Sequence, residues 1–202
     1  MAQDKTIEPD TARRRGRMKL FMILAICAAP IIASYFVYYV ATPSERTNYG
    51  TILDPRTLPI PDMATTTLDG TPRTLADLKG KWLMVRVGGA ECLEECQRQL
   101  WAMRQWTLMQ GKNKDRIERV WLVTDDQPLE TVLIREYDGT EMLRAPGATV
   151  EKWLPAEPGT TPSDHIYLID PRGNLMMRWP KQPEPPRVHK DISKLLKASA
   201  IG

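Results

Sequence analysis

Two cysteines, Cys92 and Cys96, are the residues of this sequence best placed to carry out chemistry. They lie in the segment GGAECLEECQRQL, where an apolar strand expected at residues 82–87 passes into a helix expected at residues 94–110. The junction of a strand's carboxyl end with a helix's amino end is where α/β sheets commonly place their sites. The helix dipole favours thiolate there, and the C-x-x-x-C spacing puts both sulfurs on one side of a helical turn. The pair therefore predicts a disulfide, a redox couple or a site for a soft metal ion.

The charged neighbours of the cysteine pair work against a free thiolate. Glu91, Glu94 and Glu95 disfavour a further negative charge on the sulfurs, and Arg98 offsets them only in part. Thiolates held by a metal suffer less, because the cation dominates the local charge. A permanent structural disulfide also stays open, since C-x-x-x-C is less specific for redox work than C-x-x-C.

The elements expected around the pair alternate between strand and helix. Apolar runs predict strands and amphipathic runs predict helices, in the order β-α-β-α-β-β-α. They are expected at residues 82–87, 94–110, 120–123, 129–137, 166–169, 175–179 and 188–198. Residues 140–163 are expected to form a loop with one helical turn near 150–153. This order predicts an α/β sandwich with a mixed central sheet.

An apolar segment precedes this domain. Residues 20–41 hold 22 apolar or small residues, which is long enough to cross a bilayer. The basic run RRRGRMK comes directly before them, so the positive-inside rule predicts a cytoplasmic amino terminus and an exported remainder from residue 45 onward. A cleaved signal peptide is the alternative, but its apolar core is usually only about 7–15 residues long. Cys27 fits as a small apolar residue in lipid.

Charge and domain organisation limit the classes of function. The net charge of +3 comes entirely from residues 1–19, so the rest of the chain is formally neutral and lacks the basic surface of a nucleic-acid binder. Three cysteines are too few for a disulfide-built scaffold. The expected parts are a cytoplasmic basic tail (1–19), a transmembrane helix (20–41), a linker (42–61) and one domain (62–202).

Three segments together, GKWLMVRVGGAECLEEC, VWLVTDD and HIYLIDPRGNLMMRW, resemble the SCO/SenC family. The resemblance runs over residues 62–200 and extends to the single anchor and the linker. It implies a thioredoxin-like fold and a role in assembling the copper centre of cytochrome c oxidase. It also implies copper binding through Cys92 and Cys96, although Leu93 stands where the family has proline.

The same resemblance implies a histidine as the third copper ligand. His165 is the candidate, with Asp164 beside it to orient the ring, although it lies nearer to the strand than the family's histidine does. An ordinary surface histidine is the alternative. The second histidine, His189, is expected to be a solvated or capping residue at the start of the last helix.

The function implied by the resemblance is copper-centre assembly, by binding copper or by reducing a disulfide in the copper site to thiols. The expected partner is a subunit of cytochrome c oxidase or another copper-site protein, reached from the bacterial inner membrane with the domain in the periplasm. Two alternatives remain open. One is a membrane-tethered thiol–disulfide oxidoreductase, in which Cys92 attacks and Cys96 resolves. The other is a scaffold whose disulfide is only structural.

Overall fold

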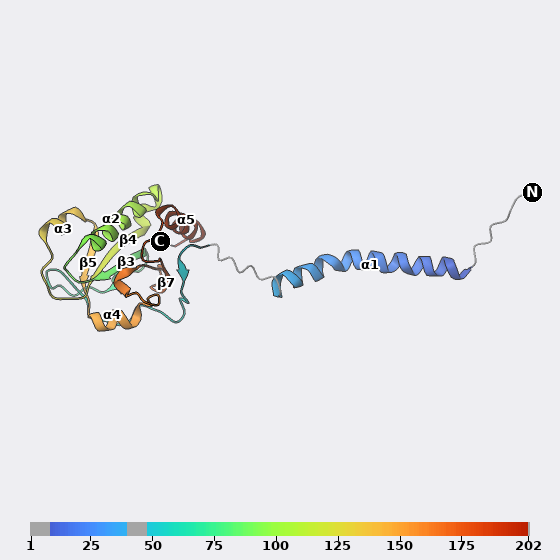
Figure 1. The fold of residues 1–202 in the computed structure, drawn as a ribbon, viewed down its shortest axis with the longest axis horizontal. Helices are drawn as coiled ribbons and strands as arrows, with labels where there is room; N and C mark the ends of the chain where they lie inside the picture. The colour runs from blue at the N-terminus through green and yellow to red at the C-terminus, as the bar shows by residue number, and fades with distance from the viewer. Residues whose placement is uncertain (1–8, 40–47, 202) are drawn as a thin grey trace, which may run out of the picture. The chain divides into compact units, whose positions relative to one another are not determined.

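The computed structural model describes residues 9–39 and 48–201, which belong to two compact units divided after Thr47 (Figure 1). In the first unit the described residues form one helix, α1 (Pro9–Tyr39). By length and composition its segment Arg13–Tyr39 is a candidate membrane span, within which an 18-residue stretch has a mean hydropathy of 2.4. The helix covers most of the predicted span and continues upstream through the basic run. Residues 40–47, which include the end of the predicted span, lie outside the described part.

The second unit is built on a mixed sheet (Figure 1). Among the described residues it has seven strands, in the spatial order β1-β7-β6-β3-β4-β5-β2. The parallel pairs are β3 with β4 and β4 with β5, whereas the outer strands and β6 pair antiparallel. The strands are β1 (Thr51–Ile52), β2 (Thr66–Thr67), β3 (Trp82–Gly88), β4 (Ile117–Val123), β5 (Thr140–Arg144), β6 (Ile166–Ile169) and β7 (Leu175–Arg178).

Helices cover both faces of the sheet. The α-helices are α2 (Glu94–Leu108), α3 (Thr131–Glu136), α4 (Gly147–Trp153) and α5 (Pro185–Ala198), and the 3₁₀ turns are η1 (Leu75–Leu78), η2 (Gly111–Arg116) and η3 (Pro162–Asp164). Side chains of a strand alternate between faces, and β3 follows this rule. Leu83, Val85 and Val87 pack in one core cluster with α4. Trp82 and Met84 pack in another cluster with α2 and α5.

The predicted α/β sandwich with a mixed central sheet is confirmed, and three local predictions are corrected. Residues 140–144, expected in a loop, form β5, because they pair with β4 and β2. The helix expected at 129–137 is the shorter α3. The last helix begins at Pro185 rather than at residue 188, because proline has no N–H to lose in the first turn of a helix.

Candidate functional site

The two predicted cysteines are joined in a disulfide at the amino end of α2. Their Cα atoms lie 5.1 Å apart. Cys92 is partly exposed, whereas Cys96 is buried in a cluster that includes Ala90 and Leu100. Cys92 is therefore the more exposed cysteine of the pair.

A buried arginine lies directly behind the disulfide. Arg86, on β3, is 3% exposed, and its Nη1 donates to the Sγ of Cys96 at 3.0 Å. Its Nε donates to Gln99 Oε1 at 3.1 Å and its Nη2 to the carbonyl oxygen of Val87 at 3.0 Å. The guanidinium also lies 4.8 Å from the centre of the Trp121 ring. The strand and the helix thus hold this cation against the inner sulfur.

Two glycines at the end of β3 make this arrangement possible. A Cβ atom at Gly88 would lie 2.7 Å from Arg86 Nη2, so glycine leaves room for the guanidinium. A Cβ at Gly89 would collide with the carboxylate of Asp125. That carboxylate accepts the backbone N–H of Ala90, at 3.1 Å from each oxygen, and so fixes the loop that leads to Cys92.

The charge of Arg86 has no anionic partner in contact. None of the ion pairs between the described residues includes it. Burial lowers the pKa of Arg86 to about 10, and the negative charge of Glu95 opposes this shift. Glu95 is itself paired with Arg98 at the surface. The guanidinium stays protonated at neutral pH, so the site contains a buried positive charge.

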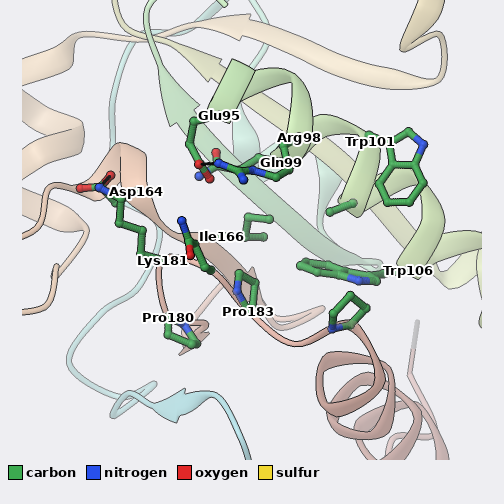
Figure 2. Close-up of a pocket in the computed structure, with 13 residues that line it drawn as sticks. Glu95, Arg98, Gln99, Trp101, Trp106, Asp164, Ile166, Pro180, Lys181 and Pro183 are labelled. Carbon is green, nitrogen blue, oxygen red and sulfur yellow. Dashed lines mark hydrogen bonds and ion pairs between the residues drawn. The ribbon is translucent and has the colours of Figure 1, made fainter. Parts of the chain in front are cut away.

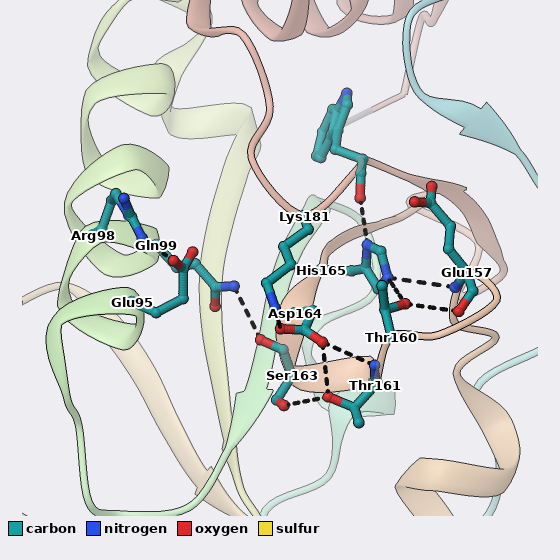
Figure 3. A network of polar contacts seen from close by, with 11 residues as sticks. Glu95, Arg98, Gln99, Glu157, Thr160, Thr161, Ser163, Asp164, His165 and Lys181 are labelled. Atoms are coloured by element: carbon teal, nitrogen blue, oxygen red, sulfur yellow. Dashed lines mark hydrogen bonds and ion pairs between the residues drawn. The ribbon is translucent and has the colours of Figure 1, made fainter.

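His165 has its ring nitrogens occupied by protein groups (Figure 3). Its Nδ1 lies 2.9 Å from the carbonyl oxygen of Trp179, which can only accept, so Nδ1 carries the proton. Its Nε2 lies 2.7 Å from the hydroxyl of Thr160 and accepts a longer bond from the N–H of Glu157. The side chain is fully buried, unlike the surface histidine weighed as the alternative. Burial lowers the pKa of His165 below its ordinary value.

The predicted copper ligands do not form a three-ligand site as they stand. Within residues 9–39 and 48–201, no group of three or more His, Cys, Asp or Glu side chains is arranged to hold a metal ion. Both sulfurs of Cys92 and Cys96 are consumed by the disulfide, and the Arg86 cation lies where it would repel a metal bound to Cys96. The donor set therefore does not fit copper in this state. His189, the other histidine, is half-buried on α5.

A groove of about 240 Å³ lies alongside α2 (Figure 2). It runs between that helix and the proline-rich residues 180–185. Trp101, more than half exposed, and Pro183 contribute apolar surface to it. Gln99 lines the groove and also contacts Arg86, while its amide donates to the carbonyl oxygen of Ser163 (Figure 3). The groove thus lies directly beside the disulfide site.

Arg86 is the site residue that the sequence analysis missed. It is the lone charged residue in the apolar run WLMVRVG, and the two-residue period of a strand puts it on the same face as Trp82 and Met84. That face receives α2, which starts beside the cysteines. A charge in the middle of a buried strand was the available signal, because such a charge needs a polar partner from the element packed against it.

Comparison with solved structures supports the SCO/SenC resemblance at the level of the fold. Yeast Sco1 matches with a TM-score of 0.56 and 18% identity, covering 71% of this chain and 99% of that chain. A SCO1/SenC family lipoprotein from Bacillus anthracis matches with a TM-score of 0.55 and 20% identity, covering 73% and 98%. Yeast Sco1 with copper bound matches with a TM-score of 0.54 and 16% identity, covering 76% and 91%. No curated protein matched the sequence.

Two family models match the chain itself. The transmembrane-like N-terminal domain matches residues 9–41, which contain the candidate membrane span. The transmembrane-like, thioredoxin-like C-terminal domain matches residues 82–199, which contain the disulfide, Arg86 and most of the sheet. The chain therefore belongs to the family defined by the transmembrane-like, thioredoxin-like C-terminal domain.

Proposed function

We propose that this protein is a membrane-tethered thiol–disulfide oxidoreductase that exchanges electrons with cysteine pairs of exported proteins. The observation that carries this proposal is a disulfide between an accessible sulfur, on Cys92, and a buried sulfur, on Cys96, that contacts the guanidinium of Arg86. A disulfide that only braced the fold would need neither the accessible sulfur nor the buried cation.

The exchange takes place at Cys92. A thiolate of a partner dithiol attacks the Cys92 sulfur, the Cys92–Cys96 bond breaks, and Cys96 leaves as a thiolate. The partner's second thiolate then attacks the partner sulfur that is bonded to Cys92 in the mixed disulfide, and Cys92 is released as a thiolate. The pair has gained two electrons and, after protonation, two protons, and the partner has gained a disulfide. In the reverse direction Cys92 attacks a partner disulfide and Cys96 resolves the adduct.

The proposed location follows from the amino-terminal segment. We propose that α1 anchors the protein in a bacterial inner membrane, with the basic residues before it in the cytoplasm and the thioredoxin-like domain in the periplasm. The periplasm is oxidising, which suits a cysteine pair that cycles between thiol and disulfide. The anchor keeps the pair close to membrane-bound partners.

Copper-centre assembly is the second candidate. The fold likeness to yeast Sco1 with copper bound favours it. In this role the partner is a subunit of cytochrome c oxidase or another copper-site protein. The domain either reduces the cysteines of that copper site or carries copper as cargo once its own disulfide is open.

A trapping experiment tests the first candidate. The Cys96→Ser variant keeps the attacking sulfur and lacks the resolving one, so we expect mixed disulfides between the full-length membrane protein and exported proteins with cysteine pairs. Non-reducing electrophoresis followed by mass spectrometry identifies the partners. The matched Cys92→Ser variant retains only the buried sulfur and is expected to trap at least tenfold less. Equal trapping by both variants, or by neither, contradicts the proposal.

A copper arm of the same experiment distinguishes the second candidate. The reduced full-length protein, in detergent and without oxygen, is loaded with Cu(I), desalted and analysed for metal beside the Cys92→Ser variant. Retained copper that disappears in the variant supports delivery of copper as cargo. Absence of retained copper, together with an adduct to a copper-site protein, supports reduction of that protein's cysteines.

A further inference from the structure

We infer that Arg86 stabilises the negative charge formed on Cys96 when the disulfide opens, and that it thereby poises the pair to accept electrons from exported dithiols. This inference rests on the proposed thiol–disulfide exchange and adds its preferred direction. In this role Arg86 contacts one of the reacting atoms, the leaving sulfur of Cys96, and does not touch the partner.

The oxidised state leaves the charge of Arg86 uncompensated. Its contacts are the Gln99 amide oxygen, the Val87 carbonyl oxygen and the Cys96 sulfur, all of which are neutral while the disulfide is closed. The Trp121 ring faces the guanidinium and adds an attraction to its π-system. A buried cation with only neutral partners is costly, since no full opposite charge replaces the water it has lost.

Opening of the disulfide supplies the missing anion. The attack on Cys92 pushes the bonding electron pair onto Cys96, whose sulfur already lies 3.0 Å from Arg86 Nη1. The neutral contact then becomes a charge-assisted hydrogen bond in a region from which solvent is largely excluded. This hydrogen bond stabilises only the reduced state. It therefore shifts the equilibrium with any dithiol toward the reduced cysteine pair.

The glutamates near the cysteine pair destabilise a thiolate on Cys96 less than Arg86 stabilises it. Glu91 and Glu94 are exposed, so water and salt screen them. Glu95 is partly compensated by its ion pair with Arg98. The buried guanidinium contacts the sulfur directly and is screened least.

Gln99 has a specific part in this arrangement. Its side-chain oxygen accepts from Arg86 without carrying a charge, and its amide donates to Ser163, so it orients the guanidinium without neutralising it. A carboxylate in its place would provide Arg86 with a permanent partner. The cysteine thiolate would then lose the benefit of the cation.

The experiment measures the equilibrium of the full-length protein, in detergent, with reduced and oxidised glutathione. We expect Arg86→Met to lower the equilibrium constant for reduction of the pair at least tenfold, which corresponds to about 30 mV for a two-electron couple. Arg98→Met, which removes an exposed cation from the same end of α2, is the matched control and is expected to change the constant less than threefold. A folded Arg86→Met protein with the wild-type constant overturns the inference.

Two further variants keep the test decisive if Arg86→Met does not fold. Gln99→Glu retains Arg86 and gives it a carboxylate partner, so we expect a decrease of the constant in the same direction. Arg86→Lys retains the charge and is expected to change the constant less than threefold from the wild-type value. An unchanged constant in Gln99→Glu, with a native near-ultraviolet circular dichroism spectrum, contradicts the inference by itself.

Failure of this inference can be told apart from failure of the proposed function. Glutathione needs no docking partner, so the constants report on Arg86 whatever the partner is. The proposed function fails if Cys96→Ser traps no exported protein, even where the variants shift the constant as expected. The inference alone fails if Cys96→Ser traps partners while the constants of Arg86→Met and Gln99→Glu equal that of the wild type.

Discussion

At the scale of single residues, the role of each candidate depends on which of its atoms are already hydrogen bonded. The SCO/SenC resemblance implied both Cys92 and His165 as copper ligands. Cys92 retains an accessible sulfur beside a buried partner, whereas both nitrogens of His165 contact Trp179, Thr160 or Glu157. A neutral imidazole has one donor and one acceptor, so this ring has no lone pair left for a metal. We interpret His165 as a structural residue.

The structural role of His165 predicts a pH dependence of stability. Burial lowers the pKa of His165 in the folded state below its ordinary value of 6.5. As the pH falls through that value, the unfolded chain takes up the proton first, so folding loses stability until the pH reaches the folded-state pKa. Denaturant unfolding of the full-length protein should show this loss as the pH falls below about 6.5.

The control for this prediction is the other histidine. His165→Asn removes the titrating ring, so its stability should vary less over the same range, although it is less stable at neutral pH because a buried contact is lost. His189→Asn alters a half-buried ring on α5 and should keep the wild-type dependence. A His165→Asn protein with the full wild-type pH dependence would show that another group is responsible.

At the scale of elements, β3 and α2 carry the site, and their sequences determine what meets there. The alternation along β3 puts Arg86 on the face toward α2, and the helix presents Cys96 and Gln99 three residues apart on its inner side. At the edge of the sheet formed by β1, the start of the domain is bound to α5. The carboxylate of Asp191, 2% exposed, accepts the backbone N–H groups of Tyr49 and Gly50 at 3.1 and 2.8 Å.

The contacts of Asp191 predict that removing its carboxylate lowers the stability of the fold without affecting the disulfide. Asp191→Ala leaves two backbone donors without their acceptor, and we expect a loss of about 3 kcal/mol in the free energy of unfolding. Chemical denaturation measures it, with Asp54→Ala, a more exposed carboxylate with local contacts, as the control. The glutathione equilibrium of Asp191→Ala should equal that of the wild type. A shifted equilibrium would mean that stability, and not local charge, controls the disulfide.

At the scale of the whole molecule, a formally neutral domain follows a basic, apolar amino-terminal segment. The formal charge of +3 belongs to residues 1–19, and the candidate span includes the uncharged segment that follows. This separation suits a membrane anchor whose basic end stays in the cytoplasm.

The proposed orientation predicts where the cysteines can be labelled. In intact bacterial spheroplasts treated with a membrane-impermeant reductant, Cys92 should react with a membrane-impermeant maleimide. The double variant Cys92→Ser/Cys96→Ser should not react, because its remaining Cys27 lies within the apolar segment. Labelling of the wild type only after lysis would mean that the domain is cytoplasmic and would contradict the orientation.

The elements of the fold were predictable where the pattern is local. The apolar run of β3, the amphipathic run of α2 and the hairpin across residues 170–174 all show in the sequence, because burial of one face imposes its period on the residues. Strand β5 was not predictable in this way. Its residues are short and mixed in character, and its conformation depends on hydrogen bonds to β4 and β2, which are distant in sequence.

The sequence by itself determined the membrane-span candidate, the alternating α/β order and the cysteine pair as the candidate centre of the chemistry, because each depends on neighbouring residues. Only the tertiary structure decided that Arg86 contacts Cys96 and that His165 is sealed among Trp179, Thr160 and Glu157. These contacts join residues from different elements. Their geometry follows from how β3 packs against α2 and how the loop before β6 folds over the sheet, and no local pattern encodes either.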